Sequence, residues 1–520
     1  MHAFDWLIIA LYLVAMLALA AALGRKQRSR RDYFLGGNDL PPWSLATSTI
    51  ATQASTNSLL GAPAFVGFIL GGGMLWLQYE LAVPLAMLLL IWLLGTVRKT
   101  GHISIYTFLE DRLGPQARLL ASGVFLIFRG LATGVTVYGV SIMVTLMVDV
   151  SYTRAVLLLM AVTILYDVLG GMRAVVISDV LQMGLILAAV LISLLLLTDS
   201  LGGLSELISF HAETDRMRAL DWSWGLSAGE NYGIWPMLFG GLFLYMAYYG
   251  CDQSQAQRVL ASRSPADAER VLVLNGLLRF PLVLLYCLLG LALAAYAAQH
   301  EGFIDALPLT AAGQPNYNLV FPAFVLSNFP VGLVGLILAG ILAAAMSSID
   351  SSLNALSAAT IEDFLARNTG HQRSERWFFI AAKVTTLCWG LFAVGFSYQV
   401  EAIAPTVLEA INKIGSLANG PLLGLFGIAL LVPAVGQRRA IAGFATGFAA
   451  NVAIWLWLPQ ISWLWWNVTG CVVCITSAVL GSGVQRVAPA YAPESGSWIY
   501  LSGMAVLIFC LCLGLNALAA

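Results

Sequence analysis

A run of hydroxyl, carboxylate and amide side chains lies in an apolar part of this sequence. Residues 343–354 read AAAMSSIDSSLN and follow the apolar run GLVGLILAGIL. Residues three and four apart share a helix face. One face therefore carries Ser347, Asp350 and Ser351, and the neighbouring face carries Ala344, Ser348 and Ser352. A charged side chain at the centre of a membrane helix costs about 3 kcal/mol, so Asp350 needs a functional reason.

The chemistry that these residues favour is the binding of a small hard cation. Hydroxyl and carboxylate oxygens are hard ligands, and a sodium ion needs only oxygen donors, without histidine or thiolate. Packing is the competing explanation for the serines, because small and hydroxyl residues are enriched where membrane helices meet. Packing does not need the carboxylate of Asp350. A second carboxylate, Asp179 in GGMRAVVISDVLQ, could approach the serine helix from another side.

A second polar stretch interrupts the region 43–73, which reads WSLATSTIATQASTNSLLGAPAFVGFILGGG. Its middle third is rich in Ser, Thr, Gln and Asn and is followed by Gly61 and Pro63. Irregular backbone at membrane depth persists only where it is buried in protein or lines a cavity. Unwound carbonyls at such a break can coordinate a cation, and half-helix ends can meet a charged solute.

The elements that must position these residues are membrane helices. The chain has 520 residues, of which 59% are hydrophobic and 10% are charged, against about 25% charged in soluble proteins. Apolar blocks of about 20 residues predict helical spans. We expect fourteen: 5–23, 44–72, 74–96, 119–147, 153–170, 178–198, 233–251, 271–298, 331–359, 377–398, 406–433, 438–459, 463–484 and 498–518.

The basic residues give these spans an orientation. With the N-terminus outside, nineteen of the 26 Lys and Arg residues fall in inside loops. Only three fall in outside loops: Arg154, Arg216 and Arg218. Because Lys and Arg concentrate in cytoplasmic loops, this asymmetry predicts a multi-pass protein of the cell membrane with both termini outside.

Other classes of function receive little support from the sequence. The net charge of −1 gives no indication of nucleic-acid binding. The motif HExxH is absent, and the five histidines are scattered, so we expect no enzyme. The seven cysteines lie in apolar segments and are interpreted as small hydrophobic residues, with no transition metal. We expect a small-molecule solute and the lipid bilayer as partners, and no obligate protein partner.

Broken helices recur with a spacing that predicts a repeat. The span 233–251 contains Pro236, Gly240, Gly241 and Gly250 and starts five spans after 44–72. Because five is odd, five-helix units starting at these spans run in opposite directions, an arrangement typical of secondary transporters. The expected division is an N-terminal helix with a basic loop (1–43), a first repeat (44–200), an external segment (201–232), a second repeat (233–433) and three C-terminal helices (434–520).

Several motifs together resemble the sodium:solute symporter family. They are YTFLEDRLG (106–114), GGMRAVVISDVLQ (170–182), YGCDQSQAQR (249–258), AAAMSSIDSSLNALSAATIEDF (343–364) and NGPLLGLF (419–426). The resemblance runs almost from end to end. It implies an all-α polytopic fold of two inverted five-helix repeats, like that of a bacterial amino-acid/sodium symporter, with flanking helices and about 14 transmembrane helices.

The resemblance also implies sodium ligands. The family's conserved site uses carbonyls of the first broken helix with a carbonyl and two hydroxyls of a later helix. At the matching positions stand Ala51, Ala54, Ala344, Ser347 and Ser348. Some relatives bind a second sodium ion, which would here involve Asp179, Ser347, Asp350 and Ser351. Those relatives usually carry serine or threonine in place of Asp350, so this chain departs from their pattern.

The same resemblance places the solute beside the two helix breaks. The candidate residues are Gln53, Ser55, Ser58, Gln78, Arg129, Tyr245 and Tyr248. Tyr248 resembles an aromatic inner gate of sugar-transporting relatives, although any one tyrosine also fits a core position. Arg129 suits a carboxylate held by two hydrogen bonds, or a salt bridge to Glu80 or Asp167. In acid-sugar-transporting relatives an arginine lies about one turn away on this helix.

We expect sodium-coupled import of a small organic solute by alternating access, with an organic anion such as a carboxylate, acid sugar or vitamin favoured. A neutral sugar or an amino acid is the alternative, and a proton-coupled carrier or a passive facilitator is a remote one. One sodium ion crossing about 100 mV gains about 2.3 kcal/mol, enough for roughly fifty-fold accumulation of a neutral solute. An incoming anion cancels that electrical gain, which favours two sodium ions.

Overall fold

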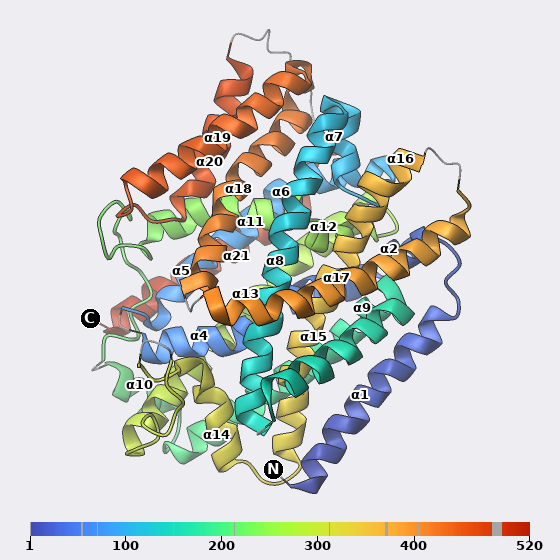
Figure 1. The fold of residues 1–520 in the computed structure, drawn as a ribbon. Coiled ribbons are helices and arrows are strands. Elements are labelled where there is room, and N and C mark those ends of the chain that lie inside the picture. The colour runs from blue at the N-terminus through green and yellow to red at the C-terminus, as the bar shows by residue number, and fades with distance from the viewer. Residues whose placement is uncertain are drawn as a thin grey trace.

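The computed structural model shows a bundle of helices (Figure 1). It describes residues 2–53, 56–69, 71–148, 150–212, 214–310, 313–369, 373–403, 406–480 and 491–519. Within these ranges the regular structure is helical, apart from one isolated bridge between Leu309 and Pro315. The all-helical class expected from the continuous apolar blocks is therefore confirmed.

The helices follow the chain in this order: α1 (Ala3–Gly24), α2 (Arg30–Leu35), α3 (Pro42–Gln53), α4 (Thr56–Phe68), α5 (Trp76–Tyr79), α6 (Ala82–Thr100), α7 (Tyr106–Leu113), α8 (Pro115–Val148), α9 (Tyr152–Ser200), α10 (Leu204–Ala212), α11 (Gly241–Cys251), α12 (Gln253–Leu260), α13 (Pro265–Gln299), α14 (Val320–Asn328), α15 (Leu333–Ala359), α16 (Arg367–Thr369), α17 (Glu375–Ile403), α18 (Thr406–Leu431), α19 (Gln437–Trp457), α20 (Trp465–Val479) and α21 (Ser495–Ala519). A π-helical turn, Pro236–Gly240, leads into α11, and another, Thr360–Ala366, follows α15.

Helices long and apolar enough to cross a membrane account for much of the bundle. The described residues contain nine of them and three shorter apolar helices. The expected span 44–72 is divided between α3 and α4, and 74–96 includes α5 and most of α6, so the number of fourteen crossings stays a prediction. The spans 153–170 and 178–198 both lie in α9, which turns at Gly171. Gly171 has a φ of 51°, and a Cβ there would stand 2.7 Å from the Tyr33 ring, so only glycine fits this turn.

Two helix interruptions lie near the middle of the molecule. The first separates α3, which ends at Gln53, from α4, which begins at Thr56. The second separates α11 from α12 at Asp252, whose backbone is extended and whose side chain accepts from the Ser254 amide. From the Pro and Gly residues of 236–250 we expected an interruption in this span; it carries the π-helical turn Pro236–Gly240, and the extended backbone follows its end at Asp252. Gly240 allows close packing, since a Cβ there would stand 2.6 Å from the Leu464 carbonyl.

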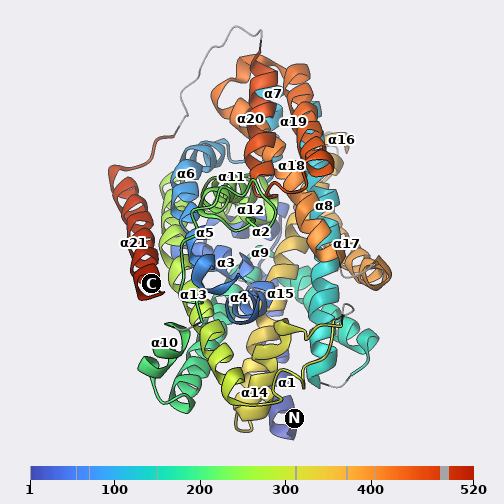
Figure 2. The ribbon, with the colours of Figure 1, turned by 90° about the vertical axis from the view of Figure 1, so that its left-hand side faces the viewer.

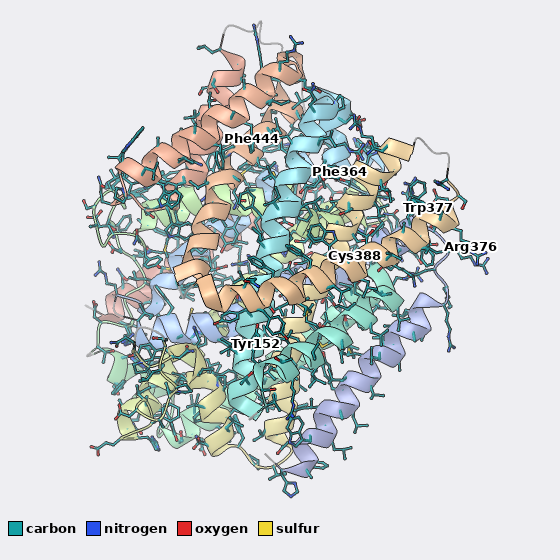
Figure 3. The ribbon with its side chains drawn as sticks, in the orientation of Figure 1. Tyr152, Phe364, Arg376, Trp377, Cys388 and Phe444 are labelled. Atoms are coloured by element: carbon teal, nitrogen blue, oxygen red, sulfur yellow. The ribbon has the colours of Figure 1, made fainter. Side chains whose placement is uncertain are left out.

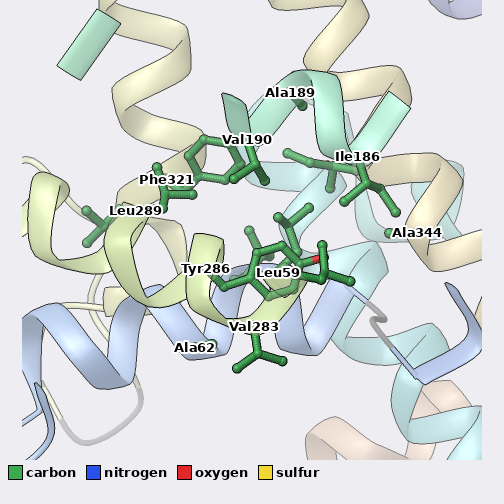
Figure 4. Packing of buried hydrophobic residues seen from close by; sticks show 14 of the residues in the cluster. Leu59, Ala62, Ile186, Ala189, Val190, Val283, Tyr286, Leu289, Phe321 and Ala344 are labelled. Carbon is green, nitrogen blue, oxygen red and sulfur yellow. The ribbon is translucent and has the colours of Figure 1, made fainter. Parts of the chain in front are cut away.

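The interrupted helices are surrounded by the most buried part of the bundle. Figure 2 shows α3 and α4 beside α13 and α15 near the centre, with α21 at the edge. Figure 4 shows side chains of α4, α9 and α13 packed together, with Leu59, Val190 and Tyr286 among them. Polar atoms in this region have no access to bulk water, so they need partners within the protein or a ligand.

The outer face is apolar, as expected for helices that contact lipid. On α17 the residues Ile380, Val384, Leu387 and Leu391 follow one another at helical spacing, and each is exposed. Figure 3 shows Cys388 of the same helix on this face. Without a water-excluding partner such a stripe would be unfavourable in water, and it indicates that α17 borders the hydrocarbon of the bilayer.

Candidate functional site

The end of α3 meets the serine face of α15. Ser348 Oγ lies 3.1 Å from the Thr52 carbonyl oxygen and 3.3 Å from the Ala344 carbonyl oxygen. The last four carbonyls of a helix lack partners within it, and the helix dipole makes that end partly negative. Three oxygens and a negative helix end therefore converge at one point, an arrangement that suits a small cation.

Four of the predicted sodium ligands lie on α3 and α15, which pack against each other. Ala344, Ser347 and Ser348 lie on consecutive turns of α15, and Ala51 is buried in the last turn of α3. Ala54 falls outside the described residues, as does Ser55 of the predicted solute site. The carbonyl of Thr52, which we did not predict, faces Ser348.

Asp179 of α9 reaches the serine helix, as its position in the sequence led us to expect. Ser347 Oγ donates to Asp179 Oδ1 over 2.5 Å, and Ser48 of α3 donates to Oδ2. A guanidinium that we did not predict also lies here. Arg258 of α12 places Nη2 3.1 Å from Asp179 Oδ2, and the same nitrogen donates to Ser351 Oγ. All of these side chains are buried.

Asp350 lies on the same face of α15 but has fewer partners. Its Oδ1 accepts from Ser351 over 3.2 Å. Its Oδ2 is buried and has no hydrogen-bond partner among the described residues. A buried carboxylate oxygen without a partner is costly, so this atom marks a place where a cation, a proton or a water molecule would be favourable.

A cavity of about 230 Å³ lies beside the break between α3 and α4. Four predicted solute residues, Gln53, Ser58, Tyr245 and Tyr248, line it, and Ser58 Oγ donates across the break to the Gln53 carbonyl over 3.1 Å. The other lining residues are Ile50, Trp76, Tyr79, Leu244, Arg279, Leu282, Val283 and Tyr286. The volume lies below the about 300–1,000 Å³ of sites for drug-sized ligands, so it suits a small solute.

Arg279 of the cavity wall belongs to a buried ion pair that the sequence did not reveal. Arg279 of α13 donates to both carboxylate oxygens of Glu80, at 2.7 and 2.9 Å. It also donates to the hydroxyls of Tyr245 and Tyr249, at 2.7 and 3.1 Å. The cavity wall therefore carries a positive group that is already neutralised, together with several aromatic faces.

Two predicted solute residues, Gln78 and Arg129, do not line this cavity, and their role in solute binding stays a prediction. Gln78 is buried outside the cavity, where its Nε2 donates to the Tyr232 carbonyl over 2.5 Å and its Oε1 accepts from the Asp221 amide over 3.0 Å. It ties the segment before α11 to α5. The Gln78 side chain thus forms hydrogen bonds with backbone groups of an irregular segment, and such groups need partners when they are buried.

Arg129 of α8 forms a salt bridge with Asp252, at the break between α11 and α12. Its guanidinium also stacks on the Tyr248 ring at 5.5 Å. The internal salt bridge that we considered is therefore present, but its partner is neither Glu80 nor Asp167. Arg129 lines a separate cavity of about 50 Å³, and Tyr248 forms a wall of both cavities.

Comparison with known proteins assigns the chain to a family. The model of the sodium:solute symporter family matches residues 33–447. The chain belongs to this family. It is 27% identical to the sodium/sialic acid symporter of Aliivibrio fischeri over 91% of both chains, and 27% identical to the human sodium-coupled monocarboxylate transporter 1 over 87% of this chain and 73% of that one.

A solved structure supports the same fold. A Na⁺-coupled sialic acid symporter in a substrate-bound outward-open state superposes with a TM-score of 0.84. It is 24% identical, and the match covers 94% of this chain and 99% of the other. As a sodium:solute symporter, the chain uses sodium ions to drive a solute across the membrane and is not an enzyme.

Two residues that we did not predict from the sequence, Arg258 and Arg279, have long side chains that form hydrogen bonds with residues of other elements. Arg258 was counted only as a basic residue of an inside loop, yet it is almost fully buried. Arg279 was recognised only as a basic residue inside a span. Only Arg279 gave a usable signal, since a charged residue within an apolar block is rarely placed there without a partner.

Proposed function

We propose that this symporter binds a sodium ion between the end of α3 and the serine face of α15, through Ala51, Ala54, Ala344, Ser347 and Ser348. The observation that carries this proposal is the short distance of 3.1 Å between Ser348 Oγ and the Thr52 carbonyl oxygen. It supports a site where carbonyls of one helix and hydroxyls of another hold one ion. Sodium would then join α3 to α15, and its release would let them separate.

The solute that we propose is a small organic anion, held in the cavity beside this site. The names of several relatives refer to sialic acid and monocarboxylates, which are organic acids. Gln53, Ser58, Tyr245 and Tyr248 offer hydrogen bonds and aromatic faces. The buried Tyr286 hydroxyl has no partner among the described residues, so a polar group of the solute would satisfy it.

A neutral sugar or an amino acid is the second candidate, and one observation favours it. Glu80 already neutralises Arg279, which is the only cation among the described residues that line the cavity. An anion that binds Arg279 must share it with Glu80, whereas a neutral solute can bind the aromatic walls without disturbing this pair.

The finer architecture is also part of this proposal. The sequence supports fourteen crossings, two inverted repeats at 44–200 and 233–433, and both termini outside. The interrupted helices α3–α4 and α11–α12 would begin the two repeats. A second sodium ion at Asp179, Ser347, Asp350 and Ser351 is a further candidate. Its affinity would depend on the guanidinium of Arg258, which contacts Asp179 and Ser351.

Uptake into proteoliposomes tests the function. The purified protein is reconstituted, and uptake of sialic acid, a monocarboxylate, a neutral hexose and a neutral amino acid is compared in sodium and in potassium. We expect one organic acid to accumulate only with an inward sodium gradient. Ser348→Ala should abolish this accumulation, whereas Ser352→Ala, one turn further along the same face, should retain it. Equal uptake in sodium and potassium for every solute would refute the sodium site.

A further inference from the structure

A crevice with an apolar lining lies between helices at the end of the bundle where the chain begins (Figures 1 and 2). Its walls come mainly from α1, α8, α9 and α15. Asp5 joins α1 to α15 at this end, since its Oδ1 accepts from the Gly332 and Gly335 amides at 2.7 and 3.0 Å. The described residues of the walls present no polar surface to the crevice. Packed helices therefore frame a space that offers no hydrogen bond to a water molecule.

The crevice opens toward the lipid-facing surface. Trp6 and Leu158 on its rim are 40% and 49% exposed, whereas Ile341 and Met346 on the α15 wall are 1% exposed. An apolar cavity of this kind stays dry. If it also stayed empty, the side chains around it would lose the dispersion contacts of a filled space. In a membrane, the hydrocarbon at the rim is the material that can fill it.

The shape of the crevice fits a hydrocarbon chain. Its lining runs from Leu338 to Met346 on α15 and from Ala155 to Val162 on α9. At about 1.5 Å per residue these stretches are about 12 and 10 Å long. One leaflet of a bilayer contains about 15 Å of hydrocarbon, half of the core thickness. The volume of about 60 Å³ admits only a slender group, such as part of one acyl chain.

A cation lies one helical turn from the rim. Arg154 is exposed in the first turn of α9 and shares a helix face with Leu158, four residues further on. Among the described residues its guanidinium has no salt bridge or hydrogen-bond partner. Helical side chains lean toward the N-terminal end of their helix, so Arg154 reaches away from the crevice toward the lipid headgroups. Trp6 on the rim is of a type that is enriched at this level of the membrane.

We propose that this crevice is a phospholipid-binding site, in which one acyl chain lies between α1, α9 and α15 and the phosphate meets Arg154. The occupant is a phospholipid rather than a simple hydrocarbon, because Arg154 stands where the headgroup of such a chain would lie. The inference goes beyond the proposed function. It depends neither on the sodium site nor on the side of the membrane that this end faces, since both leaflets contain phospholipids.

An acyl chain in this crevice would support the serine helix from behind. Successive residues of an α-helix are about 100° apart around its axis. Leu338, Leu342 and Met346 therefore share the face of α15 that lines the crevice, whereas Ser347 and Ser351 lie on the opposite face. Filling the crevice limits the space into which α15 could move away from the partners of its polar face.

Photolabelling of the purified full-length chain in detergent tests the site. The probe is phosphatidylglycerol with a diazirine in the middle of one acyl chain, and peptide mass spectrometry identifies the labelled residues. We expect Met346 to be labelled in the wild type. Val162→Phe fills the crevice and should remove this label. The matched control is Ala161→Phe, which adds the same side chain at the adjacent exposed position and should keep the label.

Two further arms identify the occupant. Arg154→Gln should lower the phospholipid label on Met346 about fivefold, as expected for the loss of one contact between Arg and an anionic lipid. Arg154→Lys should retain the label. An alkane that carries the same diazirine should label Met346 equally in the wild type and in Arg154→Gln. If the phospholipid label were also equal in both, the crevice would accept any hydrocarbon, and the phospholipid assignment would be overturned.

The proposal fails if the wild type is labelled on exposed residues such as Leu157 but not on Met346. A folded Val162→Phe that keeps the label, or an Ala161→Phe that loses it equally, would also overturn it. Gel filtration shows which variants fold. If Val162→Phe does not fold, competition in the wild type decides. Excess unlabelled phosphatidylglycerol should remove the label from Met346 before that from Leu157, and a parallel loss at both residues would refute a specific site.

Discussion

Replacing Glu80 by glutamine separates the charge of the cavity from its shape. Glutamine has nearly the same size as glutamate and can still accept a hydrogen bond from Arg279, but it leaves the guanidinium without a neutralising charge. In the wild type the two side chains are joined by bonds of 2.7 and 2.9 Å, and only 1% of Glu80 and 10% of Arg279 are exposed.

The expected loss of stability follows from this burial. Removing one partner of a buried ion pair costs about 3–5 kcal/mol, because the other charge is left uncompensated. With an unfolding entropy of roughly 2.1 cal/mol/K per residue, a chain of 520 residues loses about 1 °C of Tm per kcal/mol. Glu80→Gln should therefore lower the Tm by about 3–5 °C.

Thermal unfolding in detergent, followed by tryptophan fluorescence, measures this change. The matched control is Arg270→Gln on the same helix, whose partner is Asp267 and whose side chain is 69% exposed. Such a surface pair contributes about 0–1 kcal/mol, so the control should shift the Tm by at most about 1 °C. The double variant of Glu80→Gln with Arg279→Gln should recover most of the loss, since neither charge remains.

Transport gives a second readout of the same change. With Glu80→Gln the cavity gains one net positive charge, so uptake of an organic acid should improve relative to uptake of a neutral hexose. A Tm fall no larger than that of Arg270→Gln would refute the reasoning, because it would mean that water already neutralises Arg279. Additive losses in the double variant would show that the two side chains do not interact.

Three further perturbations have expected outcomes. Ser348→Ala should weaken sodium binding by about 10–100-fold and, because coupling is reciprocal, raise the solute Kd at fixed sodium by a similar factor, as isothermal titration would show. Tyr248→Phe removes the hydrogen bond from Gln255, at 2.9 Å, and should cost only about 0.5–1.5 kcal/mol of stability, whereas Tyr248→Ala opens the wall between the two cavities and should raise solute leak without sodium. Burial lowers the pKa of His211, whose Nε2 lies 2.8 Å from the Leu291 carbonyl oxygen. The stability contribution of His211 is therefore present above the unfolded pKa of about 6.5 and is lost as the pH falls below it. The Tm should fall between pH 7 and pH 5, and it should fall less in His211→Gln.

Local patterns in the sequence were sufficient for the membrane class and for the polar faces of α15 that the proposed sodium site uses. The apolar blocks coincide with helices because each block must bury its backbone polar groups within itself, whatever its neighbours are. The face shared by Ser347, Asp350 and Ser351 follows from helical spacing alone. The sequence also indicated Asp179 as a partner of this face, since a buried carboxylate needs one, and Ser347 donates to it.

Only the tertiary structure shows which charged side chains form pairs. Arg258 and Asp179 are 79 residues apart, and Arg279 and Glu80 are 199 apart, so no local period relates them. Gln78 forms a hydrogen bond with the backbone of the segment before α11, and Arg129 forms a salt bridge with Asp252. A buried polar group pairs with the partner that is nearest in space, regardless of where that partner stands in the chain. Spacing along a helix fixes which residues share a face, whereas the packing of several helices fixes what each face meets.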